Sequence, residues 1–97
     1  MDLDKVLHQP VRTRIVAFIT THGEATFTDL KKALHITDGN LEAHMKKLIQ
    51  TGYVEMSKET GEGRPQTMYA LTKTGLDAFQ QYVESLQVLL NIEKYPK

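Results

Sequence analysis

The chain has 97 residues and no cysteine, and its 12 Lys and Arg balance 12 Asp and Glu, so the formal net charge is zero. This length fits one domain, which we place over residues 1–97. The absence of cysteine excludes a disulfide framework and thiolate metal or redox chemistry. No apolar run approaches the ~18 residues of a membrane span, and the N-terminus lacks the apolar core of a signal peptide. The sequence therefore predicts a cytoplasmic protein with no membrane partner.

The charge balance gives little indication of a nucleic-acid partner, because domains that bind nucleic acid are usually basic. Between Lys31 and Lys73, seven Lys and Arg accompany five Asp and Glu, an excess of only two. Two copies of the chain could still gather their cations on one face.

A first helix is predicted from Pro10 to His22, before Gly23. Proline suits the first turn of a helix, and glycine commonly follows the last. Apolar residues recur at helical spacing in this stretch, at Val11, Ile15, Phe18 and Ile19. Residues 2–8 could form a short lead-in helix. Arg12 and Arg14 fit either solvated or ion-paired side chains or a phosphate contact.

Two further helices are predicted to form a helix-turn-helix. Residues 25–27 are too short for more than a strand fragment, and Thr28 is a good N-cap with Asp29 in the first turn. The inner face of this second helix would be formed by Leu30, Ala33 and Leu34. A tight turn through residues 35–36 then leads to a third helix over residues 37–51, a pattern typical of DNA-binding proteins.

The third helix has the features of a recognition helix. Thr37 can cap its start and Gly52 can end it. One stripe is apolar, with Leu41, Met45, Leu48 and Ile49 at helical spacing. The opposite side carries small, amide and ammonium groups, at Gly39, Ala43, Lys46 and Gln50, flanked by Asn40, Glu42 and Lys47. Such a face suits a helix that lies in the major groove.

After Gly52 the apolar period changes from 3.6 to 2. Residues 53–59 and 67–71 alternate, and the Gly- and Pro-rich segment 61–66 separates them, which indicates a β-hairpin with a long tip. An ordinary hairpin would explain the turn residues. Its place directly after a recognition helix favours a wing over residues 59–67, with Arg64 entering the minor groove.

A long last helix is predicted over residues 72–93, with Thr72 as its N-cap. A seam with alternating spacings of three and four runs along it, at Leu76, Phe79, Val83, Leu86 and Leu90. Nothing that follows in the chain could cover this face. We therefore expect a twofold homodimer, and the alternative is that the helix packs entirely on its own domain.

Three segments resemble the small MarR/ArsR-type winged helix-turn-helix regulators. HQPVRTRIVAFI is similar to the opening helix of that family, TDGNLEAHMKKLIQTGYVE to the recognition helix and the turn into the wing, and GRPQTMYALTKTG to the returning wing strand and last helix. The resemblance implies a mainly α fold with a small β-hairpin (α+β), an added C-terminal dimerisation helix, and a dimeric, sequence-specific transcriptional regulator. By position, the DNA-binding residues would be Thr37, Asp38, Gly39, Asn40, Glu42, Ala43, Lys46, Lys47 and Arg64.

The chain departs from that family at two positions of the recognition helix. Many relatives carry Ser where this chain has Glu42, and Arg where it has Ala43. A carboxylate beside DNA is unfavourable unless it accepts from a cytosine N4 amine. The wing also has fewer arginines than is common, so the affinity and the sequence preference are expected to differ from those of relatives.

Other functions are weakly supported by the sequence. The four histidines, His8, His22, His35 and His44, lack the clustered spacing of a metal sensor, so we expect no metal or cofactor. No nucleophile triad, HExxH motif or phosphate-binding glycine loop is present, which argues against an enzyme. The serious alternative is a winged helix that serves only as a protein–protein interaction module. A small-molecule effector is compatible with the family resemblance, but the sequence identifies none.

Overall fold

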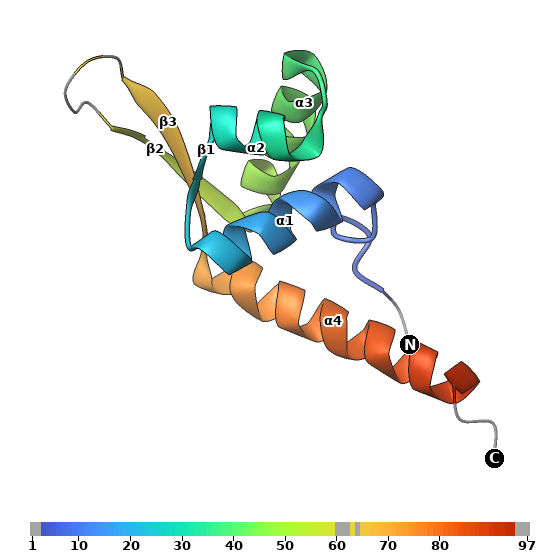
Figure 1. Cartoon of the computed structure of the whole chain (residues 1–97). Coiled ribbons are helices and arrows are strands. Elements are labelled where there is room, and N and C mark those ends of the chain that lie inside the picture. Colours follow the sequence, from blue (N-terminus) through green and yellow to red (C-terminus); the bar gives the residue numbers. More distant parts are fainter. Residues whose placement is uncertain (1–2, 60–62, 64, 95–97) are drawn as a thin grey trace.

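The computed structural model describes residues 3–59, 63 and 65–94 of the chain, and side chains only as far as residue 91. Four helices and three strands follow one another in these segments (Figure 1). In chain order they are α1 (Pro10–His22), β1 (Ala25–Thr26), α2 (Phe27–Leu34), α3 (Asp38–Thr51), β2 (Val54–Glu59), β3 (Gln66–Leu71) and α4 (Lys73–Lys94). The predicted α+β class and the long C-terminal helix are both confirmed.

The three strands form one antiparallel sheet in the order β1-β3-β2. The hairpin pairs Val54 with Leu71 and Glu59 with Gln66, in register throughout. The short strand β1 pairs Ala25 with Tyr69, so it joins the free side of β3. This pairing ties the segment before α2 to the middle of β3, and with it the helix-turn-helix to the wing.

The core lies where α1, α2 and α3 pack against each other and against the sheet. Thirteen apolar side chains are buried there: Leu7, Ile15, Val16, Ile19, Ala25, Leu30, Leu34, Leu41, Met45, Leu48, Val54, Tyr69 and Tyr82. Each large aliphatic side chain among them contributes about 1.5–3 kcal/mol relative to exposure. In α1 the predicted positions Ile15 and Ile19 are buried and Val16 joins them, while Val11 and Phe18 are only partly buried.

Residues 3–8 do not form the predicted lead-in helix. The Asp4 carboxylate accepts from the backbone N–H of Val6 (2.8 Å) and of Leu7 (3.0 Å), which folds the segment into a turn. Gln9 is extended, with φ −147° and ψ 125°. A residue before proline is disfavoured in the helical region, so the chain straightens at Gln9 before α1 begins.

The start of α2 also differs from the prediction, because Thr26 and not Thr28 is the N-cap. The hydroxyl of Thr26 accepts from the N–H of Asp29 (2.9 Å), and the Asp29 carboxylate accepts from the N–H of Thr26 (3.2 Å). This reciprocal capping box needs a spacing of three residues, which Thr28 does not have to Asp29. Ala33, predicted to face inward, is exposed.

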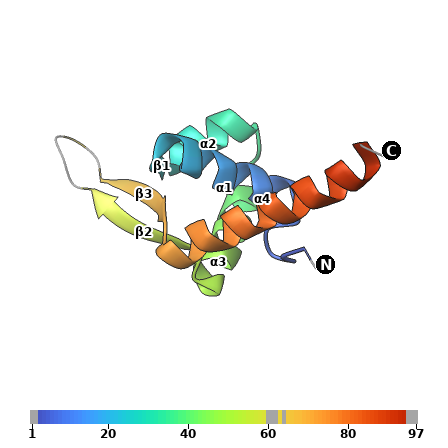
Figure 2. The same ribbon diagram turned by 90° about the horizontal axis from the view of Figure 1, so that it is seen from below.

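The helix α4 begins at a predicted cap and extends beyond the rest of the molecule. The hydroxyl of Thr72 accepts from the N–H of Gly75 (2.9 Å), which confirms Thr72 as the N-cap. We call residues 10–71 the winged body. The first part of α4 lies against this body and its C-terminal part projects away from it, on the side opposite to the hairpin tip (Figures 1 and 2).

Candidate nucleic-acid interface

The orientation of α3 is determined by its two ends and its buried stripe. Thr37 accepts from the N–H of Asn40 (3.2 Å), and Gly52 ends the helix in the left-handed region with φ 87°. The side chains of Leu41, Met45 and Leu48 are buried. This stripe fixes the rotation of α3 about its axis, so the opposite face is exposed, with Gly39, Ala43, Lys46 and Gln50. The predicted reading face is therefore accessible.

Asp38 at the first position of α3 forms an ion pair with Lys31 of α2, at 2.7 Å. Both side chains are about half exposed or more, so the pair contributes only about 0.2–1 kcal/mol. It bridges the two helices of the helix-turn-helix, an interaction that sequence reasoning missed. The Asp38 carboxylate, predicted at the DNA, is thus partly neutralised by a neighbour.

His44, on the flank of α3, contacts Arg12 of α1. The Nη1 atom of Arg12 lies 3.3 Å from Nδ1 of His44, and its Nε donates to the Val6 carbonyl (2.7 Å). Arginine offers donors only, so Nδ1 of His44 accepts and its ring is neutral. Burial and, second, the Arg12 charge lower the pKa of His44. Arg12 is therefore used inside the molecule, which neither interpretation of its sequence position predicted.

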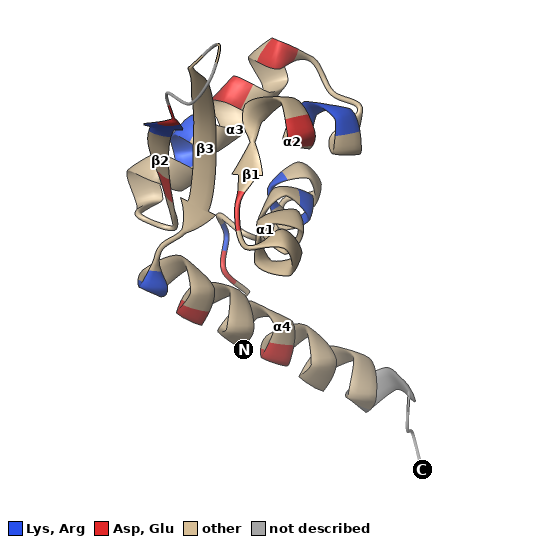
Figure 3. Cartoon of the chain, turned by 60° about the vertical axis from the view of Figure 1, so that its left-hand side comes forward, with Lys and Arg blue, Asp and Glu red and all other residues tan. Residues whose placement is uncertain are grey.

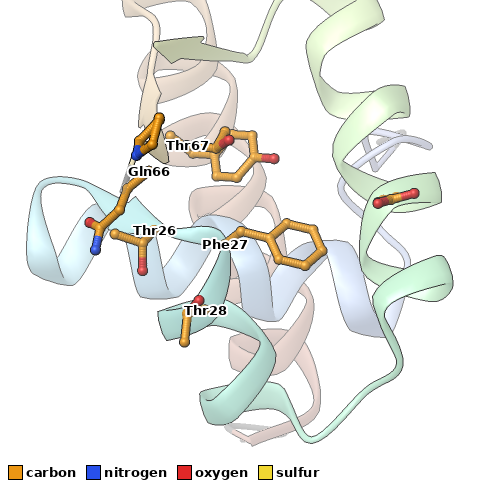
Figure 4. Close-up of a pocket in the computed structure, with 8 residues that line it drawn as sticks. Thr26, Phe27, Thr28, Gln66 and Thr67 are labelled. Carbon is orange, nitrogen blue, oxygen red and sulfur yellow. The ribbon is translucent and has the colours of Figure 1, made fainter. Parts of the chain in front are cut away.

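Glu42 lies on the flank of α3 that faces the sheet. It lines a hollow of about 720 Å³ between α3, the start of α2 and the first part of β3 (Figure 4). The other lining residues are Thr26, Phe27, Thr28, Pro65, Gln66, Thr67 and Tyr69. Burial and, second, the charge of Glu42 raise the pKa of Tyr69. The Glu42 carboxylate thus borders this hollow beside the reading face.

The wing consists of β2, β3 and the segment between them. Apart from Val54, the side chains of β2 are exposed, as are those of Pro65 and Gln66. Arg64, the predicted minor-groove residue, lies outside the described residues, as do residues 60–62 of the predicted wing. The hairpin and α3 lie on the side of the molecule away from α4 (Figures 1 and 3).

These elements match a known family. Residues 11–90 match the family described as a winged helix DNA-binding domain. The chain belongs to this family. Its family and fold are those of transcriptional regulators, which are not enzymes.

Individual relatives agree with the family assignment. An uncharacterized protein of Methanocaldococcus jannaschii is 41% identical over 90 residues, which cover 92% of this chain and 98% of that protein. A transcriptional regulator homologue from Pyrococcus horikoshii has a TM-score of 0.87 and 29% identity, covering 93% of this chain and 89% of that one. A MarR mutant from Escherichia coli has a TM-score of 0.74 and 24% identity, covering 82% of this chain and 58% of that one. ArsR-family and PadR structures share the fold too. The winged helix-turn-helix family predicted from the sequence is confirmed by the family match over residues 11–90.

The side of the molecule formed by α2, α3 and the hairpin carries charges of both signs. Positions of Lys and Arg and positions of Asp and Glu both occur along α2, α3 and β2 (Figure 3). On α4 the described charged side chains are only Lys73, Asp77 and Glu84. Because the formal net charge is also zero, a single chain has no net positive charge to attract it to DNA.

The predicted dimer seam of α4 is only partly free in a single chain. Phe79 and Leu86 pack against the core and Val83 is partly buried, whereas Leu76 is 39% exposed and Leu90 62% exposed. Val88 and Leu89 are also exposed, at 43% and 40%. One side of α4 thus covers the winged body, and a second apolar side remains uncovered.

Two kinds of feature are not found in the part of the chain that the structure describes. Nowhere in it do three or more His, Asp or Glu side chains gather as a metal site would require. Within those same residues, no helix is long and apolar enough to cross a bilayer.

Proposed function

We propose that this winged-helix protein is a sequence-specific transcriptional regulator that binds duplex DNA as a homodimer. One observation carries the proposal. The helix α3 is capped at both ends, held to the core by a buried stripe and exposed on the opposite face, beside a hairpin on the same side of the molecule. The fold shared with a PadR structure that contains operator DNA supports this function.

Each exposed group of α3 has a role in this proposal. Gly39 and Ala43 are small enough for the helix to approach base edges closely. Asn40 reads adenine through its amide, the usual pairing in the major groove, and Lys46 and Lys47 bind phosphates. The remaining predicted contacts, Thr37, Asp38 and Glu42, border this face, and Arg64 of the wing enters the minor groove.

The second apolar side of α4 is the proposed contact between two subunits. The exposed Leu76, Val88, Leu89 and Leu90 would be covered by the partner. The remaining seam residues Phe79, Val83 and Leu86 are partly buried in the chain itself, and their exposed parts would border this contact. Two copies of α3 would then reach successive major-groove faces about 34 Å apart. Because one neutral chain offers few phosphate contacts, pairing would supply most of the affinity.

Selection of bound duplexes from a random pool tests binding, symmetry and spacing together. We expect a palindromic site with half-sites one helical turn apart and an affinity that falls steeply with salt. Lys47→Ala should weaken all sequences alike and reduce the salt slope by about one. Asn40→Ala should relax the preference at one base position. Lys73→Ala on α4 is the matched control, and it should change neither the salt dependence of binding nor the base preference.

The competing function is a winged helix that binds only proteins. The mixed charges of the DNA-facing side and the Lys31–Asp38 ion pair favour it. Absence of binding to any duplex at low salt would establish this alternative and reject DNA recognition.

The homodimer has its own test in sedimentation. We expect a dimer at tens of micromolar and a weaker one in Leu90→Ala, because the leucine would lose apolar contacts with the partner. Met56→Ala removes another exposed apolar side chain, 54% exposed on β2, and should leave the dimer intact. A monomeric wild-type chain at this concentration would refute the dimer.

A further inference from the structure

Residues 3–9 form a segment that contacts both the DNA-reading side and the long helix. We call this segment the N-terminal strap. It is anchored in the core by Leu7, whose side chain is fully buried and whose carbonyl accepts from the Thr13 hydroxyl. The Asp4 carboxylate shapes its turn through two backbone N–H groups. The strap is therefore an ordered part of the fold.

Two contacts connect the strap to α3. Tyr53 follows the C-cap Gly52 of α3, and its hydroxyl donates to Oδ2 of Asp4 at 2.6 Å. That hydrogen bond, burial and the Asp4 charge raise the pKa of Tyr53 to about 12. Arg12 of α1 donates to the Val6 carbonyl and contacts His44 of α3. The strap is thus linked to the residue after the C-terminal end of α3 and, through Arg12, to the middle of that helix.

A third contact connects the strap to α4. Nδ1 of His8 lies 2.9 Å from the Tyr82 hydroxyl, and the two rings are 5.8 Å apart. Tyr82 is 5% exposed, near the middle of α4. In the described chain the cap of α4 is bonded to the end of α3, because the Thr72 hydroxyl donates to the Gly52 carbonyl (2.6 Å) and the Thr72 N–H to the Tyr53 carbonyl (3.0 Å). Beyond this cap, the polar connection from the middle of α4 to the α3 side of the molecule passes through the strap.

Beneath the strap, α4 is separated from Tyr53 by a hollow that opens to the surface. This hollow of about 330 Å³ is lined by Leu3, Asp4, Tyr53, Ala78, Gln81, Tyr82 and Ser85. Close packing would resist tilting of α4, whereas a hollow leaves space for it. Two tyrosine hydroxyls border this space, and both are bonded to the strap.

From this arrangement we infer that the strap sets the angle of α4 relative to α3, with Asp4, His8, Tyr53 and Tyr82 as positioning residues. In a dimer joined through α4, that angle fixes the distance between the two copies of α3. The strap would then determine which half-site spacing the protein accepts. This consequence for DNA rests on the proposed function, whereas the angle itself does not.

The first experiment measures the angle without DNA. The chain has no native cysteine, so Lys46→Cys on α3 and Gln80→Cys on α4 provide two exposed sites for spin labels. Labelled chains are diluted with unlabelled ones, so that only distances within a subunit contribute. We expect one narrow distance distribution, and a distribution at least twice as wide when Tyr53→Phe and Tyr82→Phe are added. Tyr69→Phe on β3 is the control for the loss of a phenol hydroxyl that does not contact the strap.

The second experiment measures binding to duplexes with varied half-site spacing. In the double phenylalanine variant we expect about tenfold weaker binding at the preferred spacing, because a less defined geometry lowers the effective concentration of the second site. Binding to a single half-site should not change. If the two tyrosine hydroxyls only stabilised the fold, the variant would instead bind single and paired half-sites more weakly by the same factor. The preferred half-site spacing would then not change.

The outcomes separate the strap from the proposed function. An unchanged distance distribution in the variants would overturn the inference, whatever the DNA results. A broadened distribution in a chain that binds no duplex would support the strap and reject DNA recognition. Circular dichroism checks folding of the double variant, and Tyr82→Phe alone gives the same test if the double variant unfolds.

Discussion

Gly75, in the first turn of α4, allows a close approach that no other residue permits. A Cβ atom built at this position would lie 2.0 Å from the Tyr53 carbonyl oxygen and 2.8 Å from its carbon. Both are backbone atoms, which cannot rotate away as a flexible side chain can. Gly75→Ala must therefore displace the start of α4 or the turn after α3 by about an ångström, the scale of overpacking in a core.

Opposing terms decide the size of the effect. Alanine in a helix is more favourable than glycine by up to about 1 kcal/mol, so without the contact the variant would be more stable. Overpacking costs about 1–3 kcal/mol. The displacement also threatens the hydrogen bond from the Thr72 N–H to the Tyr53 carbonyl (3.0 Å), worth about 0.5–1.5 kcal/mol. We expect a net loss of about 2 kcal/mol from these terms.

Urea unfolding followed by far-UV circular dichroism measures this loss, at one fixed protein concentration because dimerisation adds stability. Gly39→Ala is the matched control, since nothing lies within 4 Å of its built Cβ. The control should be as stable as the wild type or more so. A Gly75→Ala variant that is as stable as this control would refute the reasoning from the close approach.

Three further changes test the core, the pH dependence and a helix cap. Leu41→Ala removes a fully buried side chain and should lower the free energy of unfolding by about 2–5 kcal/mol in urea titrations. Because the pKa of His44 is lowered in the folded protein, the unfolded chain binds a proton at this histidine more readily than the folded chain does. The free energy of unfolding should therefore fall as the pH drops below about 6.5. His44→Gln keeps an acceptor for Arg12 and should remove this part of the pH dependence. Thr26→Ala should lower the free energy of unfolding by about 0.5–2 kcal/mol, because the capping box is lost. Thr28→Ala should lower it by less than about 0.5 kcal/mol, because Thr28 is exposed and outside the cap. Equal losses in the two variants would contradict the assignment of Thr26 as the N-cap.

Local signals were enough to predict the helices and the hairpin. Helix α3 carries its cap, its apolar stripe and its final glycine within one short stretch, so its bounds and exposed face followed directly. The start of α2 was misplaced because Thr26 and Thr28 are both acceptable caps. Only the reciprocal bond with Asp29 distinguishes them.

Contacts between distant parts of the chain could not be predicted in this way. The periodicity of α4 identified a long amphipathic helix but not which side covers the winged body. That choice depends on contacts with distant parts of the chain, such as the one between His8 and Tyr82, which are 74 positions apart in sequence. The placement of Glu42 beside Tyr69 likewise depends on the register of β3, which the alternating pattern does not specify.

The sheet has one long open edge, and its composition affects how the protein behaves in concentrated solution. In the described chain, β2 pairs only with β3, so the other side of its backbone is unpaired. Such an edge invites strand addition from a neighbouring molecule, and charged side chains oppose it. Here Glu55, Lys58 and Glu59 occupy half of the six residues of β2. They would discourage growth into aggregates through the sheet and leave the apolar side of α4 as the favoured contact between chains.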